Sequence, residues 1–267
     1  MYKAVFVDVD GTLVDSNKTV SNETMEAIKK AQEKGIQIII CTGRQRAGAK
    51  SFKEMCGLSR YVICTNGAEI YDCENKETLF KATIDEDVAK KMYEFSMEND
   101  MLIKLNFGPT RAITKLEFIE DNEIFLEEDI DEFLAKNKIT QITLCSEDIS
   151  KIELGKAFVD SNTRIKTINQ FVWKVNNKTM HCIHCTNPNV SKGNAMAGLC
   201  KYLGIDIKNA VAIGDDINDV SMIEMAGLGV AMENGIDEAK KVADVVTASN
   251  EESGVGKVLQ KIVEGGI

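Results

Sequence analysis

The chain has 267 residues, of which 32 are basic and 42 acidic, so its formal net charge is −10. With 44% hydrophobic and 28% charged residues, the composition is that of a globular protein and excludes a disordered chain, a collagen-like repeat and a disulfide-dense miniprotein. The acidic balance disfavours nucleic-acid binding, which needs clustered lysine and arginine, and the sequence has no apolar run of about 18 residues that could span a membrane.

The first segment of the chain alternates predicted strands and helices. Short apolar runs predict buried parallel strands at residues 4–7, 36–41 and 61–64. Ser21 can cap a helix that Gly35 ends, and a polar helix follows Arg44. The last segment repeats this order, with a helix after Ser191 and strands at residues 210–213, 228–231 and 243–246. This alternation predicts an α/β fold with a parallel sheet between two layers of helices.

The middle of the chain differs because its predicted strands come in neighbouring pairs. These strands lie at residues 101–107, 111–116, 164–168, 171–175 and 179–185. The first two form one antiparallel pair, and the next two form a second pair that the last strand can extend. Predicted helices separate the two groups. We therefore expect a small α+β domain at residues 84–185, inserted into an α/β core made of residues 1–83 and 186–267.

Cysteine usage and the N-terminus favour a cytoplasmic protein. Eight cysteines are scattered through the chain, several of them inside apolar runs. The N-terminal residues turn acidic at Asp8, before an apolar stretch long enough for a signal peptide can form. We expect all eight cysteines to be thiols that act as small hydrophobic residues in a reducing compartment.

Four polar clusters follow a predicted core strand or begin a core helix. They are Asp8–Thr12, Thr42–Arg44, Ser191–Gly193 and Gly214–Asp219. In open α/β sheets, ligands bind beyond the carboxyl ends of the strands. Clusters that are far apart in the sequence can therefore converge on one site at this edge.

The side chains of these clusters complement one another chemically. Four carboxylates come from Asp8, Asp10, Asp215 and Asp219. Without a cation they would repel one another, and oxygen ligands with room for water and a phosphate favour Mg²⁺. Donors and positive charge for an anion come from Thr42, the Gly43 N–H and Lys192. Carboxylates, a metal and an anion site together indicate phosphoryl transfer.

Each cluster alone has a simpler explanation. The Asp-x-Asp-Gly pattern is often only a turn, and a lysine at a helix start is usually solvated. The Asp215–Asp219 segment lacks the glycine and glutamate of an EF-hand, and neither Gly-Lys pair of the chain is followed by the Ser or Thr of a Walker loop. Segment His181–Cys185 has zinc-type residues, but they alternate between strand faces and we interpret them as structural. The joint occurrence of four clusters at strand ends favours the functional interpretation.

These motifs resemble those of the haloacid dehalogenase superfamily, and more narrowly those of its Cof-type sugar-phosphatase branch. The matching segments are Asp8–Leu13, Cys41–Arg44, Thr65–Ala68, Val190–Gly193, Gly214–Asp219 and the tail from Asn234 to Val255. The resemblance is specific in both core segments and weak in the insert. The position of the insert matches the large α/β cap of the second type in that family.

The resemblance implies a Rossmann-like parallel-sheet core with an inserted α+β cap, and it implies a role for each matched residue. Asp8 would be the nucleophile that forms an aspartyl-phosphate, and Asp10 would protonate the leaving alcohol and then activate water. The implied Mg²⁺ ligands are Asp8, the Asp10 carbonyl and Asp215, with Asp219 orienting Lys192 or lying behind the metal ligands. The implied phosphate and substrate contacts are Thr42, Gly43, Arg44, Asn66, Lys192 and Asn218.

We therefore expect a cytoplasmic Mg²⁺-dependent phosphatase of small phosphorylated metabolites, with sugar phosphates as a candidate class, and the insert as the part that selects the substrate. Two alternatives stay open. A phosphomutase of the same superfamily would need extra basic residues in the insert, and a non-catalytic metabolite-binding regulator is disfavoured by the intact carboxylate set. A dehalogenase would not need the acid–base chemistry of Asp10. The expected partner is a small phosphorylated metabolite, not nucleic acid or a membrane, and the sequence is compatible with a monomer.

Overall fold

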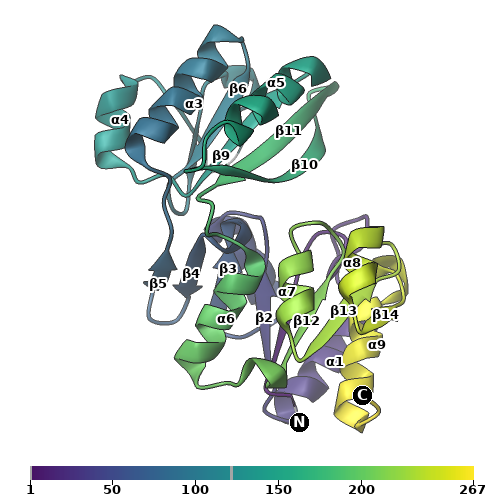
Figure 1. Ribbon diagram of the computed structural model, residues 1–267. Coiled ribbons are helices and arrows are strands. Elements are labelled where there is room, and N and C mark those ends of the chain that lie inside the picture. The colour runs from purple at the N-terminus through teal and green to yellow at the C-terminus, as the bar shows by residue number, and fades with distance from the viewer. Residues whose placement is uncertain (1, 121–122) are drawn as a thin grey trace. The chain divides into compact units, whose positions relative to one another are not determined.

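The computed structural model describes residues 2–120 and 123–267, which form two compact units (Figure 1). The first unit comprises Met1–Arg44, Gly48–Phe80 and Ser191–Ile267, and the second comprises Gln45–Ala47 and Lys81–Val190. The predicted insert, residues 84–185, lies within the second unit. No helix in the described part of the chain combines the length and the apolar character needed to cross a membrane.

An eight-stranded sheet forms the centre of the first unit, in the order β14-β13-β12-β1-β2-β3-β4-β5. Its parallel strands are β14 (Val245–Thr247), β13 (Leu228–Met232), β12 (Ala210–Gly214), β1 (Ala4–Val7), β2 (Gln37–Cys41) and β3 (Tyr61–Cys64). Strand β4 (Glu69–Asp72) runs antiparallel to β3, and β5 (Glu77–Lys81) follows at the edge. The parallel core confirms the predicted α/β class, whereas β4 and β5 were not predicted.

Helices cover both faces of this sheet, which explains why the central strands are apolar at nearly every position. Alternate residues of β1 point to opposite faces, so Val5 and Val7 pack in one cluster and Ala4 and Phe6 in the other. The first cluster includes residues of α1 (Asn22–Glu33), α2 (Arg46–Met55) and α9 (Gly254–Glu264). The second includes residues of α6 (Lys192–Leu203) and α7 (Val220–Met225), and α8 (Asp237–Val242) packs beside α7 and β13.

The predicted helix starts at Ser21 and Ser191 are confirmed. The Ser21 side chain accepts a hydrogen bond from the Thr24 N–H at the start of α1, and the Ser191 side chain accepts one from the Asn194 N–H at the start of α6. Gly204 ends α6 with a left-handed φ of 66°. Short 3₁₀ turns connect other elements at Thr65–Gly67, Ile207–Asn209 and Asn250–Glu252.

The second unit is an α+β domain with a six-stranded sheet in the order β10-β11-β9-β6-β7-β8. The strands are β6 (Leu102–Asn106), β7 (Arg111–Ile113), β8 (Glu123–Phe125), β9 (Gln141–Ser146), β10 (Lys166–Val175) and β11 (Lys178–Thr186). All neighbouring strands are antiparallel except β7 and β8. One face packs on α3 (Glu86–Glu98), α4 (Ile130–Lys136) and α5 (Ile149–Asp160), and a 3₁₀ turn lies at Leu116–Phe118.

The prediction of a strand pair at residues 164–168 and 171–175 is wrong. Residues Lys166–Val175 form one strand, with a register shift between Thr167 and Asn169, and this strand pairs with β11. The hairpin turn lies instead at Asn176 and Asn177, whose φ angles are 49° and 60°. Asparagine tolerates this left-handed conformation, which a two-residue hairpin turn requires.

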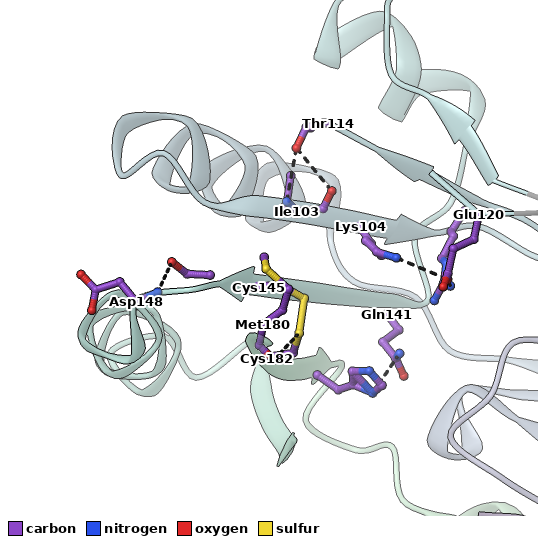
Figure 2. The surroundings of a disulfide bond; sticks show 12 residues. Ile103, Lys104, Thr114, Glu120, Gln141, Cys145, Asp148, Met180 and Cys182 are labelled. Atoms are coloured by element: carbon purple, nitrogen blue, oxygen red, sulfur yellow. Dashed lines mark hydrogen bonds and ion pairs between the residues drawn. A yellow bond between two sulfur atoms is a disulfide. The ribbon is translucent and has the colours of Figure 1, made fainter. Parts of the chain in front are cut away.

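The prediction that all eight cysteines are thiols is also wrong for one pair. Cys145 on β9 and Cys182 on β11 form a disulfide (Figure 2). The two residues are directly opposite each other in the antiparallel register, and both are buried in the apolar cluster with Leu102 and Met180. Directly opposed residues have their Cβ atoms within bonding reach, so the register brings the two sulfur atoms together. The other six cysteines keep their thiol groups and form no disulfide within the described residues.

The burial of the central strands predicts a large stability loss when one of their side chains is truncated. Ile39 on β2 is 0% exposed, so Ile39→Ala should lower the free energy of unfolding by about 2–5 kcal/mol. Val246 on β14 is 50% exposed, and Val246→Ala should change it by less than about 1 kcal/mol. Urea unfolding of both variants checks this, and equal losses would contradict the assigned core.

Candidate active site

Asp8 follows β1 directly and makes the central contact of the site. Its N–H donates to the Ile213 carbonyl of β12 at 3.0 Å, which fixes it at the carboxyl edge of the sheet. The Lys192 Nζ donates to Asp8 Oδ1 at 2.6 Å and to Asp219 Oδ1 at 2.5 Å. Lys192 and Asp219 are 1% and 0% exposed. A lysine is buried to this extent only where its charge is paired, and two carboxylates pair it here.

The start of α6 places Lys192 between these carboxylates. Ser191 caps the helix, and Lys192 is its first residue. Gly193 allows α6 to lie close to α7, because a Cβ atom at this position would be 2.4 Å from the Ser221 carbonyl oxygen. The Gly193 N–H also donates to the Ser221 hydroxyl at 3.1 Å. The glycine of the Ser191–Gly193 cluster therefore sets the position of the lysine beside it.

Asp215 and Asp219 come from the loop that follows β12. Asp219 Oδ2 accepts hydrogen bonds from the N–H groups of Asp215 at 3.0 Å and Asp216 at 3.1 Å, so this carboxylate closes its own loop as well as holding Lys192. Asp215 Oδ1 accepts from the Thr12 hydroxyl at 2.6 Å. Gly11, with φ of 79°, lies so close that a Cβ atom there would be 2.3 Å from Asp215 Oδ2.

Asp8, Asp215 and Asp219 form a carboxylate cluster whose ligand atoms lie within 4.8 Å of one another. Burial raises the pKa of Asp8, the charges of Asp219 and Asp215 raise it further, and Lys192 opposes them. Burial also raises the pKa of Asp215 to about 7, against the hydrogen bond from Thr12. Such oxygen donors fit a hard divalent cation, whose positive charge would offset the repulsion among them.

Asp10 lies two residues from Asp8 in a different electrostatic environment. Arg44 donates through Nε to Asp10 Oδ2 and through Nη2 to Asp10 Oδ1, both at 2.6 Å, and the Lys18 Nζ donates to Oδ1 at 2.7 Å. Burial alone would raise the pKa of Asp10, but the hydrogen bonds and charges of Arg44 and Lys18 outweigh it and lower the pKa to about 2. Asp10 is therefore a carboxylate in this arrangement.

A third group of predicted residues lies at the ends of β2 and β3. The Thr42 hydroxyl accepts from the Arg44 N–H at 3.2 Å, and the Thr42 carbonyl accepts from the Asn66 N–H at 3.0 Å. Asn218 donates through Nδ2 to Asn66 Oδ1 at 2.8 Å, while its own Oδ1 is buried and has no hydrogen-bond partner among the described residues. Gly43 leaves room for the Asn66 side chain, because a Cβ atom there would be 2.9 Å from Asn66 Oδ1 and the amide group would have to shift.

The structure thus places every residue predicted for the site in the first unit, in three groups. Lys192 joins the carboxylate cluster, Arg44 binds Asp10, and Asn66 joins Asn218. Sequence reasoning missed Lys18, which is part of no motif, and it gave no role to Thr12, although that residue belongs to the first cluster. In the sequence, the position of Thr12 directly after Gly11 is the one signal that could have pointed to its contact with Asp215.

The chain is similar to known proteins over nearly its whole length. The family model described as haloacid dehalogenase-like hydrolase matches residues 5–259. The phosphatase YwpJ of Bacillus subtilis (strain 168) is 27% identical over 290 residues, covering 98% of this chain and 100% of YwpJ. The 5-amino-6-(5-phospho-D-ribitylamino)uracil phosphatase YcsE of the same strain is 28% identical over 275 residues, covering 97% and 94%. A solved haloacid dehalogenase-like hydrolase from B. subtilis has a TM-score of 0.82 at 26% identity, covering 97% and 99%.

The raised pKa of Asp215 predicts how the metal-free protein responds to pH. Between the ordinary value of 3.8 and about 7, the native carboxyl of Asp215 holds a proton that the unfolded chain has lost. The free energy of unfolding therefore falls as pH rises through this range, and the fall ends once pH passes about 7. Each pKa unit corresponds to about 1.4 kcal/mol, and partial exposure reduces the effect, so we expect a loss of roughly 1–3 kcal/mol from pH 5 to pH 8.

Asp215→Asn removes this titration and should flatten the dependence. Urea unfolding at pH 5 and pH 8, in buffers containing a chelator, measures both proteins. A variant with the same pH dependence as the native protein would contradict the raised pKa of Asp215.

Proposed function

The chain belongs to the haloacid dehalogenase-like hydrolase family and is a phosphatase, and we propose that it hydrolyses small phosphorylated metabolites with Mg²⁺ through an aspartyl-phosphate on Asp8. The observation that carries this proposal is the buried Lys192 between Asp8 and Asp219, beside the carboxylate of Asp215. This arrangement combines a nucleophile, a fixed positive charge and oxygen donors for a metal at one edge of the sheet.

In the first step, Asp8 attacks the phosphorus atom of the substrate. Lys192 holds Asp8 Oδ1, which leaves Oδ2 as the attacking oxygen. The bond between phosphorus and the alcohol oxygen breaks, and the alcohol takes its proton from Asp10. The contacts of Arg44 and Lys18 favour the ionised form of Asp10, so this step requires that those contacts loosen when the substrate binds.

In the second step, water attacks the phosphorus atom and the bond to Asp8 breaks. Asp10 accepts the proton of the water, and it is already in the carboxylate form that this role needs. We propose that Thr42 and Lys192 contact the phosphoryl oxygens and that the buried amide oxygen of Asn218 accepts a hydrogen bond from a hydroxyl group of the substrate. The same residues are thus proposed to act in both steps of the reaction.

The metal would be held by Asp8, the carbonyl oxygen of Asp10 and Asp215. Mg²⁺ is the ion that carboxylate, carbonyl and water ligands favour when a phosphate is also bound. When bound, it supplies positive charge that offsets the negative charge of the phosphoryl oxygens. Asp219 is engaged by Lys192 and two backbone N–H groups, which supports a role in positioning Lys192.

The proposed substrates are small phosphate esters of polyhydroxy compounds, sugar phosphates among them. The relative YcsE is named for a substrate that carries a phosphate on a D-ribityl group. The acidic net charge of −10 favours a small substrate over a large polyanion. We propose that the second unit contributes the selection among such esters.

The nucleophile is tested by Asp8→Asn. An amide is nearly isosteric with the carboxylate but is a poor nucleophile, so turnover should fall by roughly 10⁴-fold or more. Lys192 keeps Asp219 as its partner in the variant, so the thermal midpoint should stay close to that of the native protein. Phosphate release from p-nitrophenyl phosphate with Mg²⁺ measures activity. Asp237→Asn, an exposed acid on α8, is the matched control and should retain full turnover.

The metal is tested by chelation and titration. EDTA should abolish turnover and Mg²⁺ should restore it, because Asp8 and Asp215 repel each other without a cation. Asp215→Asn removes one anionic ligand and should raise the Mg²⁺ concentration needed for half-maximal activity by about tenfold or more. Full activity after exhaustive chelation would exclude the proposed metal dependence.

A further inference from the structure

Lys18 makes a contact with Asp10 that no motif of the chain predicts. Its Nζ atom donates to Asp10 Oδ1 at 2.7 Å, on the same oxygen that accepts from Arg44 Nη2 at 2.6 Å. Asp10 Oδ2 accepts only from Arg44 Nε, at 2.6 Å, among the hydrogen bonds found in the described residues. A carboxylate oxygen has two acceptor positions. Lys18 therefore saturates Oδ1 and leaves the remaining acceptor position on Oδ2.

A tight turn holds Lys18 in the conformation that reaches Asp10. The Asp15 carboxylate accepts hydrogen bonds from the N–H of Asn17 at 2.9 Å and from the N–H and hydroxyl of Thr19 at 2.8 and 2.7 Å. The Asp15 backbone pairs with Thr19 and Lys18 at 2.9 and 3.0 Å. Lys18 itself has φ of 60°, a left-handed conformation that lysine rarely adopts. The turn thus maintains an unfavourable backbone conformation at this one residue.

The C-terminal segment fixes this turn and the loop that precedes it. The Asn234 side chain donates to the Gly11 carbonyl at 2.8 Å, and the Asn250 side chain donates to the Val14 carbonyl at 2.9 Å. Glu251 accepts from the Ser16 N–H at 2.8 Å. Residues more than 200 positions away in the sequence therefore hold the loop that carries Lys18.

Stabilisation of the fold is a weak explanation for this arrangement. The side chains of Lys18 and Asp10 are 57% and 41% exposed, and ion pairs with such exposure contribute little to stability. Lys18 has a strained backbone conformation, Asp15 holds the turn, and three hydrogen bonds with distant residues hold the loop. A surface ion pair does not need this much support. The partner of the lysine is the residue to which the proposed mechanism assigns the proton transfers.

We propose that Lys18 is a positioning residue that orients the Asp10 carboxylate for hydrolysis of the aspartyl-phosphate, an inference that rests on the proposed function. With Oδ1 held by Lys18 and Arg44, Oδ2 is the oxygen that takes the proton of the attacking water. The water oxygen forms a bond to phosphorus, and the bond between phosphorus and Asp8 breaks with its electron pair returning to the Asp8 carboxylate. Inorganic phosphate leaves, and the proton on Asp10 is later lost to solvent.

Measuring the two steps of the reaction separately distinguishes this positioning role of Lys18 from a role in substrate binding. p-Nitrophenolate leaves without a proton, so the first step with p-nitrophenyl phosphate does not need Asp10 as an acid. Loss of Lys18 should therefore slow only the second step. In Lys18→Met with saturating Mg²⁺, kcat should fall by roughly 10- to 100-fold, part of the 10²- to 10⁴-fold that a general base contributes, while kcat/KM stays within about threefold. Rapid mixing should show a burst of about one nitrophenolate per active site.

Three further variants complete the test. Lys18→Asn also removes the ammonium group but tolerates a φ of 60°, so a similar loss in both variants excludes a backbone effect. Lys18→Arg keeps a donor for Oδ1 and should recover most of kcat. Lys29→Met removes the same charge from an exposed position of α1 and should match the native protein.

Two results would overturn the inference. An unchanged kcat in Lys18→Met would show that Lys18 does not act on hydrolysis, and a raised KM with unchanged kcat would show that it binds substrate instead. Failure of the proposed function is distinguishable, because the native protein would then show neither phosphate release nor any dependence of turnover on Asp8.

Discussion

Lys192 is positively charged and only 1% exposed, and its ion pairs with Asp8 and Asp219 make this burial possible. The dependence is mutual, because burial raises the pKa of Asp8 and Lys192 opposes that rise. Removal of either neighbour would leave a buried charge with one partner fewer. Strands β1 and β12 and the start of α6 must therefore meet at one edge of the sheet, and the fold of the first unit satisfies this requirement.

Asp8 and Asp10 are only two residues apart, but their surroundings shift their pKa values in opposite directions. Burial raises the pKa of Asp8, and the charges of Asp219 and Asp215 raise it further, whereas the hydrogen bonds and charges of Arg44 and Lys18 lower the pKa of Asp10 to about 2. The nucleophile must be ionised and the acid of the first step must hold a proton, so the proposed division of roles requires a bound cation beside Asp8 and looser contacts of Arg44 and Lys18 with Asp10. Gly11 makes this division possible because its missing side chain leaves room for Asp215 beside the loop that carries both residues.

Strand-end motifs and apolar periodicity were sufficient to predict the parallel core and the elements that carry the site. Asp8 and Asp215 each follow a buried strand, and Ser191 caps a helix, so their positions follow from local sequence. Side-chain partners did not follow, because Arg44 could reach either a ligand or Asp10, and no periodicity marks Lys18. The β10 error arose because the polar residues Asn169 and Gln170 interrupt the apolar pattern, whereas the strand continues through them with a register shift. The Cys145–Cys182 disulfide depends on strand register, which the sequence pattern does not define.

The central claim is that Asp8 becomes covalently phosphorylated during turnover. The most direct measurement is acid quenching of the enzyme during turnover of p-nitrophenyl phosphate with Mg²⁺, followed by proteolysis and mass spectrometry of the peptides. Quenching should be done with Lys18→Met as well as with the native enzyme, since slower hydrolysis should increase the amount of intermediate. The account predicts one phosphate on the N-terminal peptide at Asp8 and none in Asp8→Asn. Turnover without any covalent phosphate, or with phosphate on another residue, would contradict it.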